Sequence, residues 1–163
     1  MTLNTQLFGE IEINPDDIIN FHEGLPGFAE RTRFVALFQE AQEEGEGGLG
    51  EVFDTICFLQ SVDDAELSFV LIDTTPLLPE YRPLALLEYA KDAATGFDHK
   101  NLVVYNILTI HDEMSNSTAN LKAPIVLDLL NKSGRQVIFK GDDNYPIRAR
   151  IFDAPQKDGE CSC

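Results

Sequence analysis

Apolar residues along this chain gather in short segments rather than in long stripes with helical spacing. Most of these segments are rich in Ile, Val and Phe, and turn-forming residues separate them. Runs of about four to eight such residues between turn signals are typical of β-strands. Many short strands in succession favour an antiparallel barrel or sandwich over a doubly wound sheet. We predict strands at Leu3–Phe8, Glu10–Ile13, Ile18–Phe21, Arg33–Leu37, Ile56–Ser61, Ser68–Ile72, Leu102–Ile110, Ile125–Leu130 and Arg135–Phe139.

One segment shows helical spacing instead. Apolar residues recur at three- and four-residue intervals from Pro83 to Thr95, where proline suits the first helical position and Gly96 suits the end. The pattern as a whole therefore predicts a mostly β chain, with a single-domain antiparallel β-barrel-like fold and one or two short helices.

Two stretches interrupt the apolar pattern. Glu40–Glu51 reads EAQEEGEGGLGE, and Pro155–Cys163 is also polar. We interpret residues 39–51 as an acidic, glycine-rich loop insertion and residues 155–163 as a flexible polar tail. A chain of 163 residues fits one domain with a core of its own, which we place at residues 1–154.

The charge balance is strongly acidic. Twelve Lys and Arg residues stand against 28 Asp and Glu residues, for a net charge of -16. Because nucleic-acid binding depends on neutralising phosphates with Lys and Arg, we expect no direct nucleic-acid partner and no binding to anionic membranes. A basic protein is the natural complement of such a surface. The same charge also keeps a protein soluble, and composition alone supports the two explanations about equally.

No motif in the sequence predicts catalysis or cofactor binding. Gly45–Gly50 spells G-x-G-x-x-G, but Glu43, Glu44 and Glu46 would repel a diphosphate. Cys161-Ser162-Cys163 is too closely spaced for a zinc knuckle. The three histidines lack a second ligand at metal-binding spacing; they are His22, His99 and His111. We therefore predict no catalytic residue, no metal site and no cofactor, and a protein that is not an enzyme.

Localisation follows from what the chain lacks. Met1–Phe8 has no basic region followed by an apolar run, so we expect no signal peptide. No stretch approaches the roughly 18 apolar residues of a membrane span. Three cysteines, of which Cys57 lies in an apolar strand, do not form a disulfide framework. We expect a cytoplasmic protein.

Three motifs are more specific than ordinary folding requires. Gly24-Leu25-Pro26-Gly27-Phe28 suits a fixed turn that presents Leu25 and Phe28. Leu59-Gln60-Ser61 leads into Val62-Asp63-Asp64, which predicts a buried strand followed by an acidic turn. In Asn120-Leu121-Lys122-Ala123-Pro124, the proline indicates a sheet edge or a strand entrance. Direct contact with a partner and a purely structural role are equally good interpretations of this third motif.

Together these motifs resemble the FliW family of flagellar assembly factors over nearly the whole chain, from about Leu3 to Phe152. The family's order is kept by GLPGF at Gly24–Phe28, LQS at Leu59–Ser61, NLxAPI at Asn120–Ile125 and GRQVI at Gly134–Ile138. The resemblance implies a compact antiparallel β-barrel-like domain in the bacterial cytoplasm. It also implies two protein partners: flagellin, and CsrA, a small dimeric RNA-binding repressor of translation.

The resemblance further implies how the partners are used. The family member relieves CsrA's repression of flagellin translation by an allosteric route, away from the RNA-binding surface, and flagellin competes for it as a chaperone-like partner. Two features depart from the family's usual pattern: the long acidic stretch at 40–51, and Asp73–Pro76 in place of a tighter turn. The alternative from another class is a small-ligand-binding or hydrolytic β-barrel, which would need a pocket with convergent polar groups.

Overall fold

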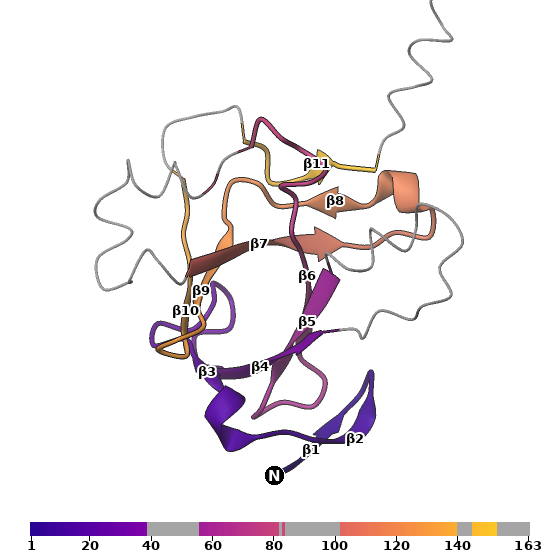
Figure 1. Cartoon of the computed structure of the whole chain (residues 1–163). Helices are drawn as coiled ribbons and strands as arrows, with labels where there is room; N and C mark the ends of the chain where they lie inside the picture. Colours follow the sequence, from indigo (N-terminus) through magenta and orange to yellow (C-terminus); the bar gives the residue numbers. More distant parts are fainter. Residues whose placement is uncertain (39–55, 82, 84–101, 140–144, 153–163) are drawn as a thin grey trace, which may run out of the picture.

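The structure is a computed structural model, and it describes residues 1–38, 56–81, 83, 102–139 and 145–152. Strands dominate these ranges, and the helical turns between them are short (Figure 1). In chain order the elements are β1 (Thr2–Thr5), β2 (Gly9–Glu12), η1 (Pro15–Asp17), β3 (Ile19–Asn20), β4 (Arg33–Phe38), β5 (Ile56–Ser61), β6 (Ser68–Ile72), β7 (Leu102–Thr109), η3 (Met114–Asn116), β8 (Thr118–Ala119), β9 (Ile125–Asp128), β10 (Ser133–Gln136) and β11 (Ala149–Arg150).

Seven of these strands close into a barrel. Strands β3 to β7 form an antiparallel series in chain order, β7 pairs with β9, β9 pairs with β10, and β10 returns to β3. The β10–β3 contact is parallel and consists of the single residue pair Ser133↔Asn20. Figure 1 shows the resulting ring, with β8 and β11 extending from the end of β7. The prediction of a mostly β, antiparallel barrel-like fold is confirmed.

Alternation along the strands builds two cores from the same sheet. Cys57 and Leu59 of β5 point into the barrel, where they meet apolar residues of β3, β4, β6, β7 and β9. The alternate residues Ile56 and Phe58 pack on the outer face, in a second cluster that includes Tyr81 and Leu121. Because successive side chains of a strand point to opposite faces, a strand buried on both sides needs a nearly continuous apolar run. The run Ile56–Leu59 meets this need.

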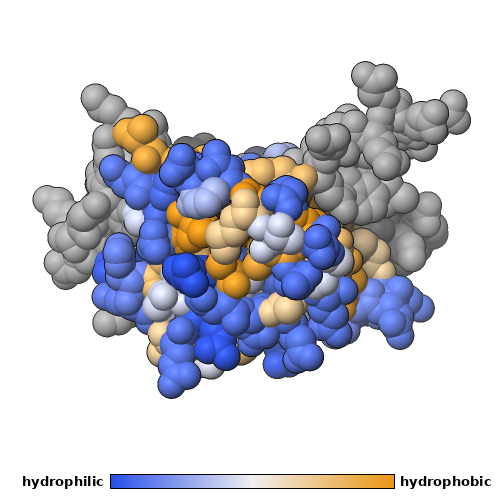
Figure 2. Space-filling view, turned by 90° about the horizontal axis from the view of Figure 1, so that it is seen from below, coloured by the Kyte–Doolittle hydropathy of each residue, from blue (hydrophilic) through white to orange (hydrophobic). Residues whose placement is uncertain are grey.

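The hairpin of β1 and β2 covers a third, smaller apolar area. Leu3 and Ile13 bury their side chains against Val35 on the outer face of β4. Figure 2 views the molecule from this side and shows apolar surface surrounded by hydrophilic residues. The partly buried residues Ile11, Ile18 and Leu37 pack around this cluster.

The predicted strands agree with the observed ones in position more closely than in length. Eight of the nine predicted segments contain a strand or the strand's main part, although the strand predicted at Ile125–Leu130 ends early at Asp128. The strand predicted at Arg135–Phe139 lies two residues earlier in the structure, because β10 runs from Ser133 to Gln136 and only half of it falls in the predicted segment. Thr118–Ala119 and Ala149–Arg150 were not predicted, because two residues are too few to show a period. Of the predicted helix, Pro83 is described and is helical, while residues 84–95 lie outside the described residues. The proposed loop at 39–51 and the tail at 155–163 lie outside them as well.

No helix among the described residues is long and apolar enough to cross a membrane.

Candidate protein-binding surface

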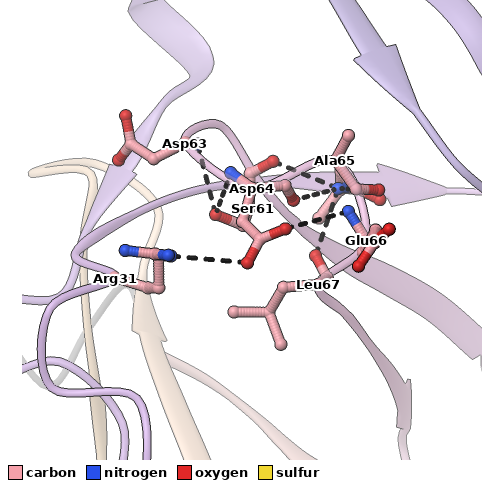
Figure 3. Close-up of polar contacts among 8 residues, drawn as sticks. Arg31, Ser61, Asp63, Asp64, Ala65, Glu66 and Leu67 are labelled. Carbon is pink, nitrogen blue, oxygen red and sulfur yellow. Dashed lines mark hydrogen bonds and ion pairs between the residues drawn. The ribbon is translucent and has the colours of Figure 1, made fainter.

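The acidic turn, residues Ser61–Leu67, connects β5 to β6 at one end of the barrel (Figure 3). Asp63 and Glu66 are exposed, whereas Gln60 and Ser61 at the start of the turn are completely buried. The turn therefore places carboxylates at the surface directly above a polar interior.

The buried amide of Gln60 holds the turn from inside. Its Nε2 donates to the backbone carbonyl oxygens of Ser61 at 3.1 Å, Asp64 at 3.2 Å and Leu67 at 3.1 Å. The Ala65 carbonyl oxygen lies 3.5 Å from the same nitrogen, so four carbonyls of one turn face inward, toward a single donor group. The other end of this amide, Oε1, is buried with no hydrogen-bond partner among the described residues. A buried polar atom left unpaired costs free energy. The hydrogen bonds donated by Nε2 therefore have to stabilise the fold by more than the unpaired Oε1 destabilises it.

The side chain of Ser61 fixes the turn from the other side. Its Oγ accepts from the backbone N–H groups of Asp63 at 3.2 Å and Asp64 at 3.1 Å. Asp64 repeats the pattern, because its Oδ1 accepts from the N–H of Glu66 at 3.0 Å. Short side chains that bond to nearby backbone donors in this way stabilise turns. The LQS motif therefore shapes the acidic turn from positions that solvent does not reach.

Two arginines lie beside the acidic turn. The Nε of Arg31 lies 3.5 Å from Oδ2 of Asp64, and the Nε of Arg33 donates to Oδ2 of Asp63 at 3.3 Å. The hydrogen bond that Arg33 donates to Asp63 raises the pKa of Arg33, and the negative charge of Asp63 adds to the effect. Three carboxylates, those of Asp63, Asp64 and Glu66, against two guanidinium groups leave one net negative charge. These two ion pairs lie at the surface, so they fix the positions of the carboxylates more than they stabilise the fold.

The GLPGF turn and the LQS strand share the barrel core, because Leu25 and Leu59 belong to the same buried cluster. Gly24 and Gly27 have φ angles of +65° and +85°, which favour glycine, and a Cβ on Gly24 would approach the Ala29 backbone to 2.6 Å. The expectation that the turn presents both apolar residues is wrong for Leu25, which is buried in the barrel interior next to Leu59. Phe28 is the exposed one, and its ring packs edge-to-face on Phe69 with centroids 5.5 Å apart.

The third motif is anchored by a buried polar network, which we call the Asn106 network. Asn106 Nδ2 donates to Tyr81 Oη at 3.1 Å and to the carbonyl oxygen of Asn120 at 2.8 Å. Tyr81 Oη donates to the carbonyl oxygen of Leu121 at 2.9 Å, and Thr74 Oγ1 donates to Asn106 Oδ1 at 2.8 Å. Burial raises the pKa of Tyr81 to about 12. This network joins β7, the 74–81 segment and the NLKAP motif in one hydrogen-bonded unit.

The NLKAP motif is therefore largely internal. Leu121, Ala123 and Pro124 are buried, and the side chain of Asn120 accepts from the Ala123 N–H at 3.0 Å. Lys122 is half-buried, so it is the residue of this motif with a long side chain that solvent reaches. Contact between Asn120–Pro124 and a partner stays a prediction, and Lys122 is the side chain that can test it.

The structure does not gather the other candidate residues into a chemical site. His22 and His111 are exposed, and His99, Cys161 and Cys163 lie outside the described residues. Within the described ranges, no cluster of three or more His, Cys, Asp or Glu side chains could hold a metal ion. Cys57 lies in the core, as its apolar strand predicts, and burial raises the pKa of its thiol to about 12. A high thiol pKa opposes reactivity.

Sequence reasoning missed the residues that support these motifs. Asn106 and Tyr81 lie far from Asn120 in the sequence, and no local pattern links them. Arg31 and Arg33 had a usable signal, because residues two apart in an extended segment share a face. Because the strand that begins at Arg33 pairs with the strand before Asp63-Asp64, ion pairs between these arginines and aspartates could have been predicted.

Comparison with known proteins places these features in one family. The family model described as FliW protein matches residues 2–151. The flagellar assembly factor FliW of Thermoanaerobacter pseudethanolicus is 35% identical over 153 residues, which cover 94% of each chain. That of Geobacillus thermodenitrificans is 35% identical over 158 residues, covering 96% of this chain and 98% of the relative.

A solved structure supports the same grouping. The crystal structure of a flagellar assembly factor FliW superposes with a TM-score of 0.73 at 34% sequence identity, covering 93% of this chain and 97% of that one. The range that the family model matches, residues 2–151, includes the barrel, the acidic turn and the NLKAP motif. The chain belongs to the FliW family of flagellar assembly factors.

Proposed function

We propose that this chain acts in the cytoplasm as a non-catalytic antagonist of a CsrA-type translational regulator. By binding the regulator it relieves repression of flagellin translation, and it also binds flagellin as a chaperone-like partner. Membership in the FliW family supports the setting in flagellar assembly. The observation that carries the proposal is the acidic turn, whose buried Gln60 and Ser61 hold surface carboxylates in place on a chain of net charge -16.

Electrostatics gives this surface two effects on an RNA-binding partner. A basic regulator is attracted over distances comparable to the Debye length, which speeds the encounter. Once the complex forms, fixed carboxylates beside the regulator repel RNA phosphates, so RNA binding weakens even if the RNA site itself stays uncovered. Antagonism from outside the RNA-binding surface therefore needs no steric competition.

The alternative of a small-ligand-binding or hydrolytic barrel has less support. The lining of the groove between the GLPGF turn and β10 includes His22, Ser133, three glycines and the ion pair of Glu23 and Arg135. Hydrolysis needs a nucleophile or base aligned with a group that orients it. Among the described residues, no hydrogen bond joins His22 to Ser133 or to a carboxylate.

The test is a reconstitution from purified components. A labelled flagellin messenger leader is bound to the regulator, and the chain is added while RNA release is measured by fluorescence anisotropy. We expect release at near-stoichiometric chain, and rebinding of RNA when flagellin is added. A double variant, Asp63→Asn with Glu66→Gln, removes two surface charges and should weaken release. Retained RNA at saturating wild-type chain would contradict the proposal.

A further inference from the structure

The barrel closes least completely between β3 and β10. These strands are parallel and share the single pair Ser133↔Asn20, supported by the Asn20 N–H donating to the Lys132 carbonyl at 2.9 Å. After Asn20 the chain turns away into the GLPGF loop, where the Phe21 N–H donates to Thr32 and the Gly24 N–H donates to Phe21. Strand β3 therefore ends just where β10 continues.

Beyond Ser133, β10 stays bonded to β9 along its other edge. Its register with β9 runs to Gln136↔Ile125, and the ladder continues as Val137 donates to Pro124 at 3.0 Å and Phe139 donates to Lys122 at 2.9 Å. Backbone groups of successive residues in an extended strand point to opposite edges. Gln136 and Ile138, which alternate with Val137 and Phe139, consequently turn their N–H and C=O groups away from β9. Among the described residues, no strand pairs with that edge after Ser133.

A groove runs along this edge. It has a volume of about 510 Å³, and its two walls are the GLPGF loop and the stretch from Ser133 to Ile138. The groove thus combines a strand edge with enough space for added chain.

Both walls of the groove are held in place. The carboxylate of Glu23 lies 3.0 Å from the guanidinium of Arg135, which ties the loop to the strand. Leu25 anchors the loop in the barrel core. Gly134 lets β10 lie close to the barrel interior, because a Cβ there would approach the Phe21 ring to 2.4 Å. A preformed groove binds with less loss of conformational entropy than a mobile one.

We infer that this groove binds an extended segment of a partner polypeptide, which adds as a strand to the free edge of β10. Strand addition of this kind uses backbone hydrogen bonds for affinity and alternate side chains for specificity. The edge from Gly134 to Ile138 spans roughly 13 Å at about 3.3 Å per residue, which suits a segment of about five residues. Ile138, whose side chain is 53% exposed, offers an apolar contact.

The net charge of the chain indicates whether the groove binds a segment of another protein or a second copy of this chain. Each copy carries a net charge of -16, so two copies repel one another, whereas a neutral or basic segment is attracted. The occupant is therefore an uncharged or basic extended segment of another protein. The inference rests on the proposed function only in that this segment belongs to one of the chain's protein partners.

The variant that tests the inference is Ile138→Pro. It removes an N–H that points away from β9, and proline is tolerated at strand edges in that orientation. Val137 continues the ladder with β9 by donating to the Pro124 carbonyl at 3.0 Å, and a residue extended in this way is compatible with a following proline. Ile138→Ala is the matched control, because it trims the same side chain and keeps the N–H. Circular dichroism and thermal unfolding establish that both variants fold.

Binding of purified flagellin and of the purified regulator is measured for all three proteins by calorimetry. For the partner that uses the groove, we expect at least about a tenfold weaker affinity for Ile138→Pro than for Ile138→Ala, because a backbone bond is lost and the added strand is blocked. Equal affinities of the two folded variants for both partners would overturn the inference. If wild-type chain binds neither partner, it is the proposed function that fails.

Amide hydrogen exchange provides a second test that needs no variant. In the free chain, the amides of Gln136 and Ile138 should exchange faster than those of Val137 and Phe139. Adding the partner should slow the first pair at least about tenfold by including them in a new ladder. Unchanged exchange at Gln136 and Ile138 in a saturated complex would contradict strand addition, whatever the calorimetry shows. A small molecule bound in the groove would likewise leave those amides unprotected.

Discussion

The acidic turn and the Asn106 network use buried amides in opposite ways. Gln60 and Asn106 are both almost completely buried, and each binds to backbone carbonyls of a neighbouring segment. Gln60 holds a turn whose outer side is charged and exposed, whereas Asn106 holds a motif whose side chains are mostly internal. A motif that is distinctive in sequence can therefore mark an exposed turn supported by buried side chains, or a contact between segments inside the core. Measuring stability and binding on the same variants should distinguish the two: substitutions in the Asn106 network should mainly lower stability, and substitutions that support the acidic turn should also weaken binding.

The largest effect is expected from Asn106→Ala. The substitution removes bonds to Tyr81, Thr74 and the Asn120 carbonyl, and leaves buried groups without partners. We expect unfolding in urea to become easier by roughly 3 kcal/mol. The folded variant should bind its partners normally. Asn116→Ala, at an exposed asparagine, is the control and should change stability by less than about 0.5 kcal/mol.

Gln60→Leu should have a smaller effect on stability and a larger effect on binding. The change removes a donor to four turn carbonyls, but it also removes the unpaired Oε1, which partly offsets the loss. We expect a cost of about 2 kcal/mol. Because the turn loses its internal support, the folded variant should also bind the regulator more weakly. Normal binding by Gln60→Leu would show that the turn's shape does not matter for recognition.

The pH dependence of stability provides a test of burial in the Asn106 network. The folded chain holds the pKa of Tyr81 at about 12, whereas an unfolded tyrosine titrates near 10. Between these values the unfolded state loses its proton and the folded state keeps it, so stability is full below pH 10 and falls as the pH rises toward 12. The slope from this residue should reach about 1.4 kcal/mol per pH unit.

Tyr81→Phe should remove that slope. Among the described residues, buried Cys57 and half-buried Tyr105 also have raised pKa values, and they contribute to the slope that remains between pH 9 and 12. Urea unfolding at a series of pH values measures all of these contributions. An unchanged profile for Tyr81→Phe would mean that the tyrosine is hydrated in the folded chain.

How far the sequence predicts this molecule depends on the range of the interaction. The strands of the barrel were predictable, because alternation and turn residues are local signals, and Ile56–Ser61 shows both. The burial of Leu25 was not, because it depends on how the turn meets Leu59 of β5. The three partners of Asn106 lie 14, 25 and 32 residues away in the sequence. The open edge of β10 follows from where β3 ends, which only the assembled barrel determines.

The smallest effects on stability are expected from substitutions in the ion pair of Arg33 and Asp63. The same substitutions should change the rate of association with a partner in opposite directions. The pair is exposed, so Arg33→Gln and Asp63→Asn should each cost less than about 1 kcal/mol of stability. Their effects on association with a basic partner should be opposite, because the first makes the chain more acidic and the second less so. Stopped-flow mixing at low salt should show faster association for Arg33→Gln and slower association for Asp63→Asn.

Salt provides the control for this pair. At high ionic strength the charges are screened, and the two variants should approach the wild-type rate together. Rates that stay apart in high salt would indicate that one of the side chains touches the partner directly. Rates that do not differ even at low salt would indicate that the acidic turn contributes to solubility and not to association. The groove beside β10 would then be the surface that recognises a partner.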